Sequence, residues 1–404
     1  MKLPVFFASL IFLLAIAFVP DYHSMEKHPI VGRSLLVYPF RASSLASSGH
    51  DSITSIRISF TGDLMCHIGQ YENSKKPDGT YDFNPSFTFV KPYLETADIT
   101  MGNLELTFAG TSVPYAGYPI FNTPDSYADA LKTAGFDFVV TSNNHAMDTE
   151  EKGLLRTLDV LKAKGIGSTG TFKSQADHDS VRILNIKGIK LGILNYTYGT
   201  NNALPPTERR YEINVIDTLA IQTDIARARN QGAELVLVYF HYGQEMKSTP
   251  NDAQKLAVRK SQEYGADIVI GGHPHVISPV NYYKTNRATL DTGIVAWSLG
   301  NFISNQYWRY TDAGLIFTLT LRKNITQNKY LKPEADYLPT WVYRGMDARM
   351  KKHIVFPAQM AITDTASIPP YIDAASRLKM KEAFEDTKGM VTKDCKEIRL
   401  RELH

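Results

Sequence analysis

The chain has 404 residues, of which 43% are hydrophobic and 21% charged, an ordinary composition for a globular protein with one large domain or two smaller ones. Its 44 basic and 41 acidic residues leave a net charge of +3 without a basic run, so no binding to nucleic acid is expected. With Cys66 and Cys395 as its only cysteines, the chain has no disulfide framework and no thiolate zinc site, and a single bridge stays open.

The N-terminus predicts export. Lys2 is followed by an apolar run to Val19 that contains the small residues AIA at 15–17, as in a secretory signal peptide. The run is also close to the length that spans a bilayer, so residues 1–24 are either a signal peptide or a membrane anchor, rather than a core helix. Both alternatives place the folded part in the periplasm or at the outer face of the cytoplasmic membrane. Residues 25–52, rich in Ser, Ala and Gly, are expected to form a flexible linker.

Strand-like and helical patterns alternate after this linker, which predicts an α/β fold with sheets covered on both faces. Strands are expected at 55–62, 98–106, 136–144, 190–197, 233–241, 266–273 and 293–302. Helices are expected at 123–135, 150–165, 215–232 and 252–265, several with a Gly stop. The run 313–324 is either an antiparallel hairpin or an edge strand. We expect one domain over 55–345 and a C-terminal extension, 346–404, with a helix near 374–386.

Polar side chains capable of binding metal follow five of these strands. Since ligands of an open α/β sheet bind at the carboxyl ends of its strands, we expect these residues to meet. The residues in question are Asp63, Asn103, Glu105, Asn144, His145, His241, His273 and His275. Isolated residues of this kind usually cap helices or form turns, but so many together favour a shared centre. The mixture of imidazole, carboxylate and amide suits Zn, Mn or Fe better than Ca.

Six motifs, taken in order, resemble those of the CapA family of poly-γ-glutamate capsule proteins. They are GDLM, GNLE, SNNHAMD, HYGQE, GGHPHV and SLGNF, and the resemblance covers roughly residues 55 to 345. That family is in turn similar to the calcineurin-like metallophosphoesterases. The resemblance therefore implies a sandwich of two sheets flanked by helices, with one or two divalent metals at the strand ends.

The resemblance also implies roles for individual residues. It makes His145 the group that assists the leaving group, and it makes metal ligands of Asp63, Asn103, Glu105, Asn144, His241, His273 and His275. Two positions depart from the superfamily pattern. Met65 stands in place of a histidine, and Asn103 stands in place of the aspartate that bridges two metals. A neutral bridge holds two cations less well, and Glu105 is a candidate to supply the missing charge.

Several neighbouring residues have two interpretations each. His67 is either a further site residue or an ordinary core or surface histidine, and Glu245 either orients a histidine or is a solvated glutamate. Asp148 is expected to cap the following helix. Ser298 and Asn301 either line the cleft or end a strand. Tyr307 and Trp308 either contact a polymer or pack.

Two classes of function fit these observations. The first is a metal-dependent hydrolase, in which metal and His145 act on a phosphoryl or acyl centre. The second is a non-catalytic member of a membrane-bound capsule synthesis complex. The CapA resemblance points to the synthesis, export or processing of an anionic envelope polymer, such as poly-γ-glutamate or a capsular polysaccharide. A phosphoesterase or other hydrolase acting on a non-capsular envelope substrate is the alternative.

Overall fold

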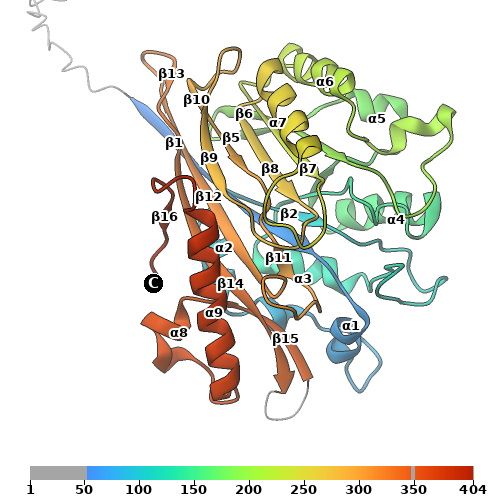
Figure 1. Cartoon of the computed structure of the whole chain (residues 1–404). Helices are drawn as coiled ribbons and strands as arrows, with labels where there is room; N and C mark the ends of the chain where they lie inside the picture. The colour runs from blue at the N-terminus through green and yellow to red at the C-terminus, as the bar shows by residue number, and fades with distance from the viewer. Residues whose placement is uncertain (1–51, 347–350, 404) are drawn as a thin grey trace, which may run out of the picture. The chain divides into compact units, whose positions relative to one another are not determined.

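The computed structural model describes residues 52–346 and 351–403, in which two β-sheets form the centre of the fold (Figure 1). The larger sheet has the strand order β15–β14–β12–β1–β2–β3–β4, with β11 beside β1, β13 beside β12 and β16 beside β14. Its strands are β1 (Ile53–Leu64), β2 (Ile99–Leu104), β3 (Phe138–Val140), β4 (Gly167–Thr169), β11 (Asn301–Ile303), β12 (Ala313–Asn324), β13 (Lys329–Tyr330), β14 (Glu334–Met346), β15 (Lys351–Pro357) and β16 (Arg399–Leu400). Strands β1 to β4 run parallel, whereas β12, β14 and β15 pair antiparallel.

The smaller sheet has the order β5–β6–β7–β8–β10–β9. Its strands are β5 (Arg182–Ile186), β6 (Ile189–Thr197), β7 (Leu235–His241), β8 (Ile268–Gly272), β9 (Val280–Lys284) and β10 (Thr292–Ala296). The inner strands β6, β7, β8 and β10 are parallel, and β5 and β9 close the edges antiparallel. Parallel strands buried on both faces explain the nearly continuous apolar runs of this region.

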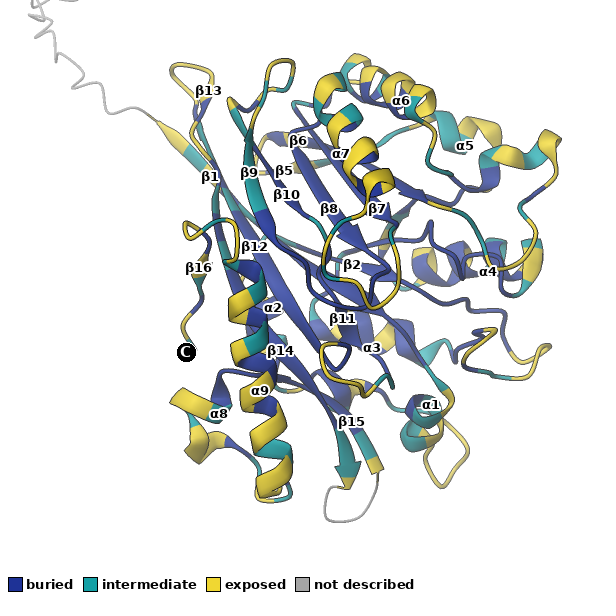
Figure 2. Ribbon diagram, viewed as in Figure 1, coloured by how far each residue is buried: buried dark blue, intermediate teal, exposed yellow. Residues whose placement is uncertain are grey.

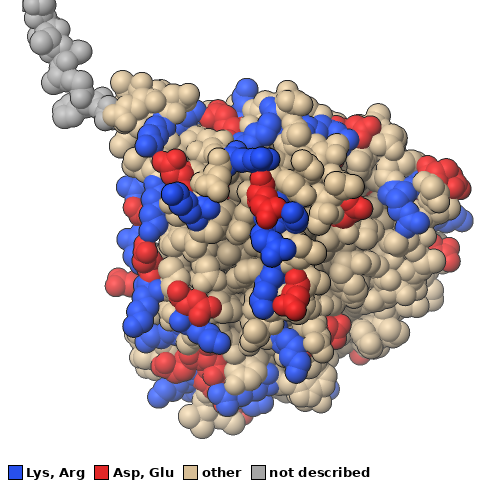
Figure 3. Space-filling view, turned by 45° about the horizontal axis from the view of Figure 1, so that its top comes forward, with Lys and Arg blue, Asp and Glu red and all other residues tan. Residues whose placement is uncertain are grey.

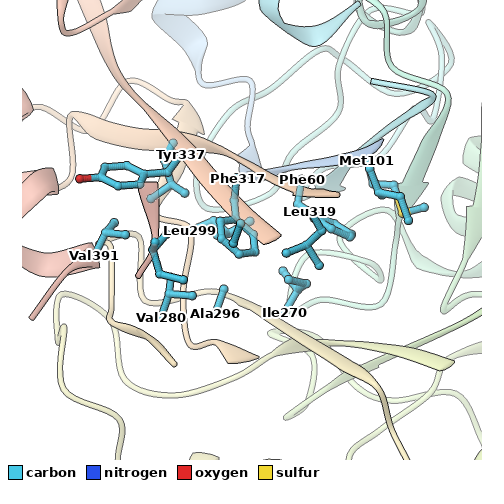
Figure 4. Packing of buried hydrophobic residues seen from close by; sticks show 14 of the residues in the cluster. Phe60, Met101, Ile270, Val280, Ala296, Leu299, Phe317, Leu319, Tyr337 and Val391 are labelled. Atoms are coloured by element: carbon cyan, nitrogen blue, oxygen red, sulfur yellow. The ribbon is translucent and has the colours of Figure 1, made fainter. Parts of the chain in front are cut away.

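The inner faces of the two sheets pack against each other. In Figure 4, Phe60, Phe317 and Leu319 of the larger sheet lie opposite Ile270 and Ala296 of the smaller one, and all five are fully buried. Burial of each large apolar side chain contributes about 1.5–3 kcal/mol. The predicted two-sheet sandwich is therefore confirmed.

Helices cover the outer faces, dark blue toward the sheets and yellow outside in Figure 2. Helices α6 (Thr218–Asn230) and α7 (Asp252–Tyr264) cover the smaller sheet, and α3 (Ser126–Ala134) and α4 (Glu150–Ala163) cover the larger one. The shorter helices are α1 (Ile68–Ser74), α2 (Lys91–Leu94), α5 (Gln175–Asp179), α8 (Met360–Thr363), η1 (Asn84–Phe87), η2 (Thr207–Glu212) and η3 (Thr365–Ser367). The predicted Gly stops are present at Gly135 and Gly265, which end α3 and α7 with positive φ.

The antiparallel half of the larger sheet departs from the sequence prediction. The run 313–324 forms β12 and pairs antiparallel with β14, but it lies between β14 and β1 and is not an edge strand. The run 293–302 is divided into β10 and β11, which join different sheets. Beyond residue 346, β15, β16 and helix α9 (Ala374–Val391) pack against β14, so the C-terminal part completes the sandwich.

Three further expectations concern the ends of the chain and its cysteines. The N-terminal segment 1–24 and almost all of the linker 25–52 lie outside the described residues. Within the described ranges, no helix has the length and apolar character needed to cross a membrane. Cys66 is buried, Cys395 is partly buried, and both are free thiols, so the single bridge left open by the sequence is absent.

Candidate metal centre

The carboxyl ends of the parallel strands meet at one edge of the sandwich and bring the predicted polar residues together. Asp63, near the end of β1, is in register with Asn103 on β2 and with Asn301 on β11. The remaining residues end β7 or follow β2, β3 and β8. All of the predicted site residues are buried: Asp63, Asn103, Glu105, Asn144, His145, His241, His273 and His275. The expected convergence in space is therefore present.

Two glycines allow close approaches at this point, Gly62 of β1 to Gly300 and Gly272 of β8 to Asp63. A Cβ atom at Gly62 would lie 1.8 Å from the carbonyl oxygen of Gly300, and one at Gly272 would lie 2.7 Å from Asp63 Oδ1. Any side chain at either position would displace the backbone or Asp63. His273 and His275 follow with φ angles of 92° and 59°. Such strain costs about 1–3 kcal/mol per residue and is typical of functional sites.

Three groups of side chains have possible ligand atoms within 4.8 Å of one another. They are Glu105 with His241 and His273, Asp63 with Glu105 and His275, and Glu245 with His273 and His275. Glu105 belongs to two of them, with Oε1 3.5 Å from His241 Nε2 and 3.9 Å from His275 Nε2. Asn144 adds its Oδ1 2.6 Å from His241 Nε2. The geometry thus offers two adjacent cation positions that share the Glu105 carboxylate.

Buried atoms without partners mark the centre of this cluster. Among the described residues, nothing donates a hydrogen bond to either carboxylate oxygen of Glu105 or pairs with His273 Nδ1. An unsatisfied buried polar group costs about 1–3 kcal/mol, and more when it is charged. Native proteins satisfy nearly all such atoms, and exceptions indicate a missing ion or a functional role. The donor set of carboxylate and imidazole fits a divalent cation.

The pKa shifts of His241 and His273 favour metal binding, whereas those of Glu105 and His275 favour a bound proton in the absence of metal. Burial, together with the charges of the neighbouring histidines, holds the pKa of His241 well below its usual value and lowers the pKa of His273 to about 3. Neutral imidazole is the form that binds metals. Burial followed by the charge of Asp63 raises the pKa of Glu105 well above the usual range. For His275, burial is the largest single effect and favours the neutral form, but the hydrogen bond and charge of Asp63, the charge of Glu245 and the hydrogen bond to Asn301 together raise the pKa.

His145 lies beside this cluster but belongs to none of the three ligand groups. Its Nδ1 is 2.7 Å from Asp148 Oδ2, and its ring meets Phe121 edge-on with centroids 4.6 Å apart. The cap prediction for Asp148 is wrong, because Oδ2 also accepts from the Phe121 backbone N–H and α4 has no side-chain cap. Asp148 instead holds the imidazole in place, an arrangement typical of a histidine that transfers protons.

Comparison with known proteins agrees with the motifs. A family model described as "Bacterial capsule synthesis protein PGA_cap" matches residues 57–306, which is more than half of the chain. The chain belongs to this bacterial capsule synthesis family. It is 28% identical to the capsule biosynthesis protein CapA of Bacillus anthracis, over 71% of this chain and 69% of that protein. It is 27% identical to the PGA biosynthesis protein CapA of Bacillus subtilis strain 168, over 66% and 68%. The predicted CapA resemblance is confirmed.

Solved structures resemble the capsule synthesis fold only distantly. The calcineurin-like phosphoesterase YfkN of Bacillus subtilis is 12% identical, with a TM-score of 0.40, covering 83% of this chain and 98% of that one. The NAD nucleotidase of Haemophilus influenzae is 12% identical, with a TM-score of 0.43, covering 87% and 65%. These TM-scores are too low to support any inference about the chemistry of the site, which is therefore inferred from the residues of this chain alone.

Asn103 lies in the cluster, but its amide points differently from the predicted ligand role. Its Nδ2 donates to Asp63 Oδ1 at 2.7 Å and lies 3.0 Å from His241 Nδ1, while its Oδ1 accepts from Asn143 Nδ2 at 3.3 Å. The side chain therefore orients two other members of the site. Glu105, and not residue 103, is the acidic side chain that lies between His241 and His275.

The residues with two interpretations are now placed. His67 directly precedes α1, contacts Gln70 and belongs to none of the three ligand groups. Asn301 lines the site, with Oδ1 3.0 Å from His275 Nδ1. Ser298 accepts from the Gly300 backbone N–H and so shapes the strand end. Glu245 is exposed yet belongs to a ligand group.

The sequence interpretation missed two residues that follow β6. The ring of Tyr198 lies 4.6 Å from that of His273, and Asn201 Nδ2 lies 3.4 Å from His145 Nε2. The signal was present, because residues 190–197 are a predicted strand and polar residues follow it directly. The rule applied to the other five strand ends also identifies this one.

Proposed function

We propose that this capsule synthesis protein binds one or two divalent metal ions, Mn, Zn or Fe rather than Ca, and acts outside the cytoplasm on a capsule polymer. Its role is in the synthesis, export or processing of an anionic polymer such as poly-γ-glutamate. The observation that carries the proposal is the Glu105 carboxylate, which is fully buried between His241 and His275 and has no hydrogen-bond donor among the described residues. The names of the two Bacillus relatives, which refer to capsule and to PGA biosynthesis, support the polymer.

The residues divide into two adjacent binding positions around Glu105. His241, His273 and the Asn144 amide oxygen would hold one ion, and Asp63 and His275 would hold the other. A bound divalent ion supplies Lewis acidity toward a carbonyl or phosphoryl oxygen and lowers the pKa of water. Asn103 and Asn301 fix the orientation of Asp63, His241 and His275 through hydrogen bonds. Such outer contacts typically change metal affinity by about 10–100-fold.

His145 gives the site a means of moving a proton. With Nδ1 held by Asp148, its Nε2 is the nitrogen left to face a substrate, near Asn201. If His145 Nε2 gives its proton to a leaving group, the protein is a hydrolase that processes the polymer. The His145–Asp148 pair favours this activity over polymer binding alone, because binding does not require an oriented imidazole beside a metal site, whereas proton transfer does.

The test combines metal content with polymer cleavage. Full-length protein and its His145→Ala variant would be incubated with poly-γ-glutamate, with surface polysaccharide and with a generic phosphodiester. We expect metal in both proteins, and cleavage of a capsule polymer by the unchanged protein only. Cleavage of the phosphodiester alone would favour a non-capsular substrate. Equal capsule production in cells by the His145→Ala variant would reject the hydrolase.

A further inference from the structure

The loop 304–311, which follows β11, exposes two large aromatic rings. Tyr307 and Trp308 are 58% and 52% exposed, and their rings stack with centroids 5.0 Å apart and an interplanar angle of 22°. Aromatic side chains of this size usually contribute to a core or an interface. Because the two rings face each other, the pair exposes its edges and outer sides, and exposed apolar surface of this kind is what ligands cover. We call Tyr307 and Trp308 the aromatic pair.

Side chains from other elements hold this loop in place. Arg344 on β14 donates to the carbonyl of Gln306 and lies 5.5 Å from the centre of the Tyr307 ring. Arg309 makes two 2.9 Å hydrogen bonds to Asp386 on α9. The Thr311 backbone N–H donates to the carbonyl of Trp308 at 3.0 Å, which closes the turn. The rings are thus presented on an anchored loop, which reduces the entropy lost when a ligand binds.

One amide connects the aromatic pair to the metal centre. Asn301 Nδ2 donates to Gln306 Oε1 and to the Thr311 carbonyl, each at 2.9 Å, and so holds the loop at both ends. The Oδ1 of the same amide lies 3.0 Å from His275 Nδ1. A single buried side chain therefore ties the loop that carries the aromatic pair to a candidate metal ligand.

Charge indicates what kind of substrate the loop accepts. Arg309 is neutralised by Asp386 and Glu382, and Arg344 lies near Asp312. On the face shown in Figure 3, basic and acidic side chains alternate without a continuous basic area. A dense polyanion such as poly-γ-glutamate would meet no excess positive charge at this loop. It also has no ring of its own that could stack on the aromatic pair. A sugar ring has a flat C–H face that aromatic rings cover well.

The geometry points to a sugar-binding subsite: the outer side of the aromatic pair stacks on a ring of a capsular polysaccharide, on a loop that Asn301 ties to His275. This inference rests on the proposed function and narrows its substrate from anionic polymers in general to polysaccharides. Poly-γ-glutamate and the membrane surface are the alternative partners, and the experiment separates them.

The test measures binding to three probes. Full-length protein and the variants Trp308→Ala, Trp308→Phe and Leu219→Ala would be titrated with surface polysaccharide from the source bacterium, poly-γ-glutamate and anionic lipid vesicles. We expect polysaccharide binding that weakens roughly tenfold or more in Trp308→Ala, as is usual when one stacked ring is removed. Trp308→Phe should restore most of it, and Leu219→Ala, which removes another exposed apolar side chain, should change nothing.

Three results would overturn the inference. They are polysaccharide binding unaffected by Trp308→Ala, binding of poly-γ-glutamate but not of polysaccharide, and a loss confined to vesicles. Metal content measured on the same samples keeps this inference distinct from the proposed function. Metal-free protein that still binds polysaccharide through Trp308 contradicts the metal site and leaves the subsite standing. Metal-loaded protein that binds no polysaccharide does the reverse.

Discussion

Glu105 Oε1 lies 3.5 Å from His241 Nε2, and both side chains are completely buried. This separation exceeds the usual 2.7–3.2 Å of an N–H···O hydrogen bond. His241 Nε2 instead lies 2.6 Å from Asn144 Oδ1, and Glu105 has no donor among the described residues, so a cation bound between the three side chains would replace one contact and satisfy the carboxylate. The stability of the metal-free protein, its metal content and its chemistry should all depend on this pair.

The first prediction concerns Glu105→Gln in metal-free protein. Burial raises the pKa of Glu105, so the folded state retains a proton that the unfolded state releases above the ordinary carboxyl pKa. Glu105 therefore contributes a loss of stability as the pH rises from about 5 to 8, and the comparison with Glu105→Gln isolates it from the opposite contribution of His241 and His273, whose pKa values are lowered. Glu105→Gln removes this penalty and should gain about 1–3 kcal/mol at pH 8. Denaturant unfolding in chelator measures it, with exposed Glu245→Gln as the control. A less stable Glu105→Gln protein at pH 8 would refute the prediction.

The second prediction concerns Asn103→Asp. The change replaces a donor by an acceptor 2.7 Å from Asp63 Oδ1, so two carboxylates would meet in a buried site. We expect a lower melting temperature without metal and recovery when Mn or Zn is added, because a cation offsets the repulsion. Melting curves with and without metal test this. Recovery with Mg or Na to the same extent would contradict a transition-metal site.

The third prediction separates a ligand from a proton carrier. His241→Ala should lower metal affinity by at least about 10–100-fold, since loss of an outer contact alone has that effect. His145→Ala should keep the metal and slow hydrolysis by roughly 10²–10⁴-fold, the usual contribution of a general acid. Metal analysis and turnover of the same preparations decide the matter. Metal loss in His145→Ala would show that the two histidines are assigned to the wrong roles.

The fourth prediction concerns location. The apolar segment that ends at Val19 motivates export of the sandwich domain. A reporter that works only outside the cytoplasm, fused after residue 52, should be active, and protease added to spheroplasts should reach the domain. A reporter active only when it remains in the cytoplasm would disprove export.

The sequence was informative about the metal centre because its signals are local. A polar residue or a glycine marks the end of each strand in the sequence, and parallel strands place those ends at one edge of the sheet. His273 and His275 could thus be predicted from GGHPHV, and Asp63 from GDLM, without knowledge of the strand order. Tyr198 was equally accessible, because it directly follows the predicted strand 190–197.

The remaining features depend on contacts between distant segments. The direction of the Asn103 amide is set by Asp63, His241 and Asn143, so no local pattern distinguishes a ligand from an orienting group. Asp148 precedes α4 as a cap does, but the closeness of His145 and Phe121 decides its partners. The position of β12 inside the sheet requires β14, whose pairing is equally non-local.

The metal content of the purified full-length protein tests the central claim most directly. Mass spectrometry should find one to two equivalents of Mn, Zn or Fe per chain, the number of positions that share Glu105. The Glu105→Gln variant should be folded and contain almost none, because its amide cannot supply the negative charge between His241 and His275. Substoichiometric metal that no added Mn, Zn or Fe restores, or an unchanged content in Glu105→Gln, would contradict the account.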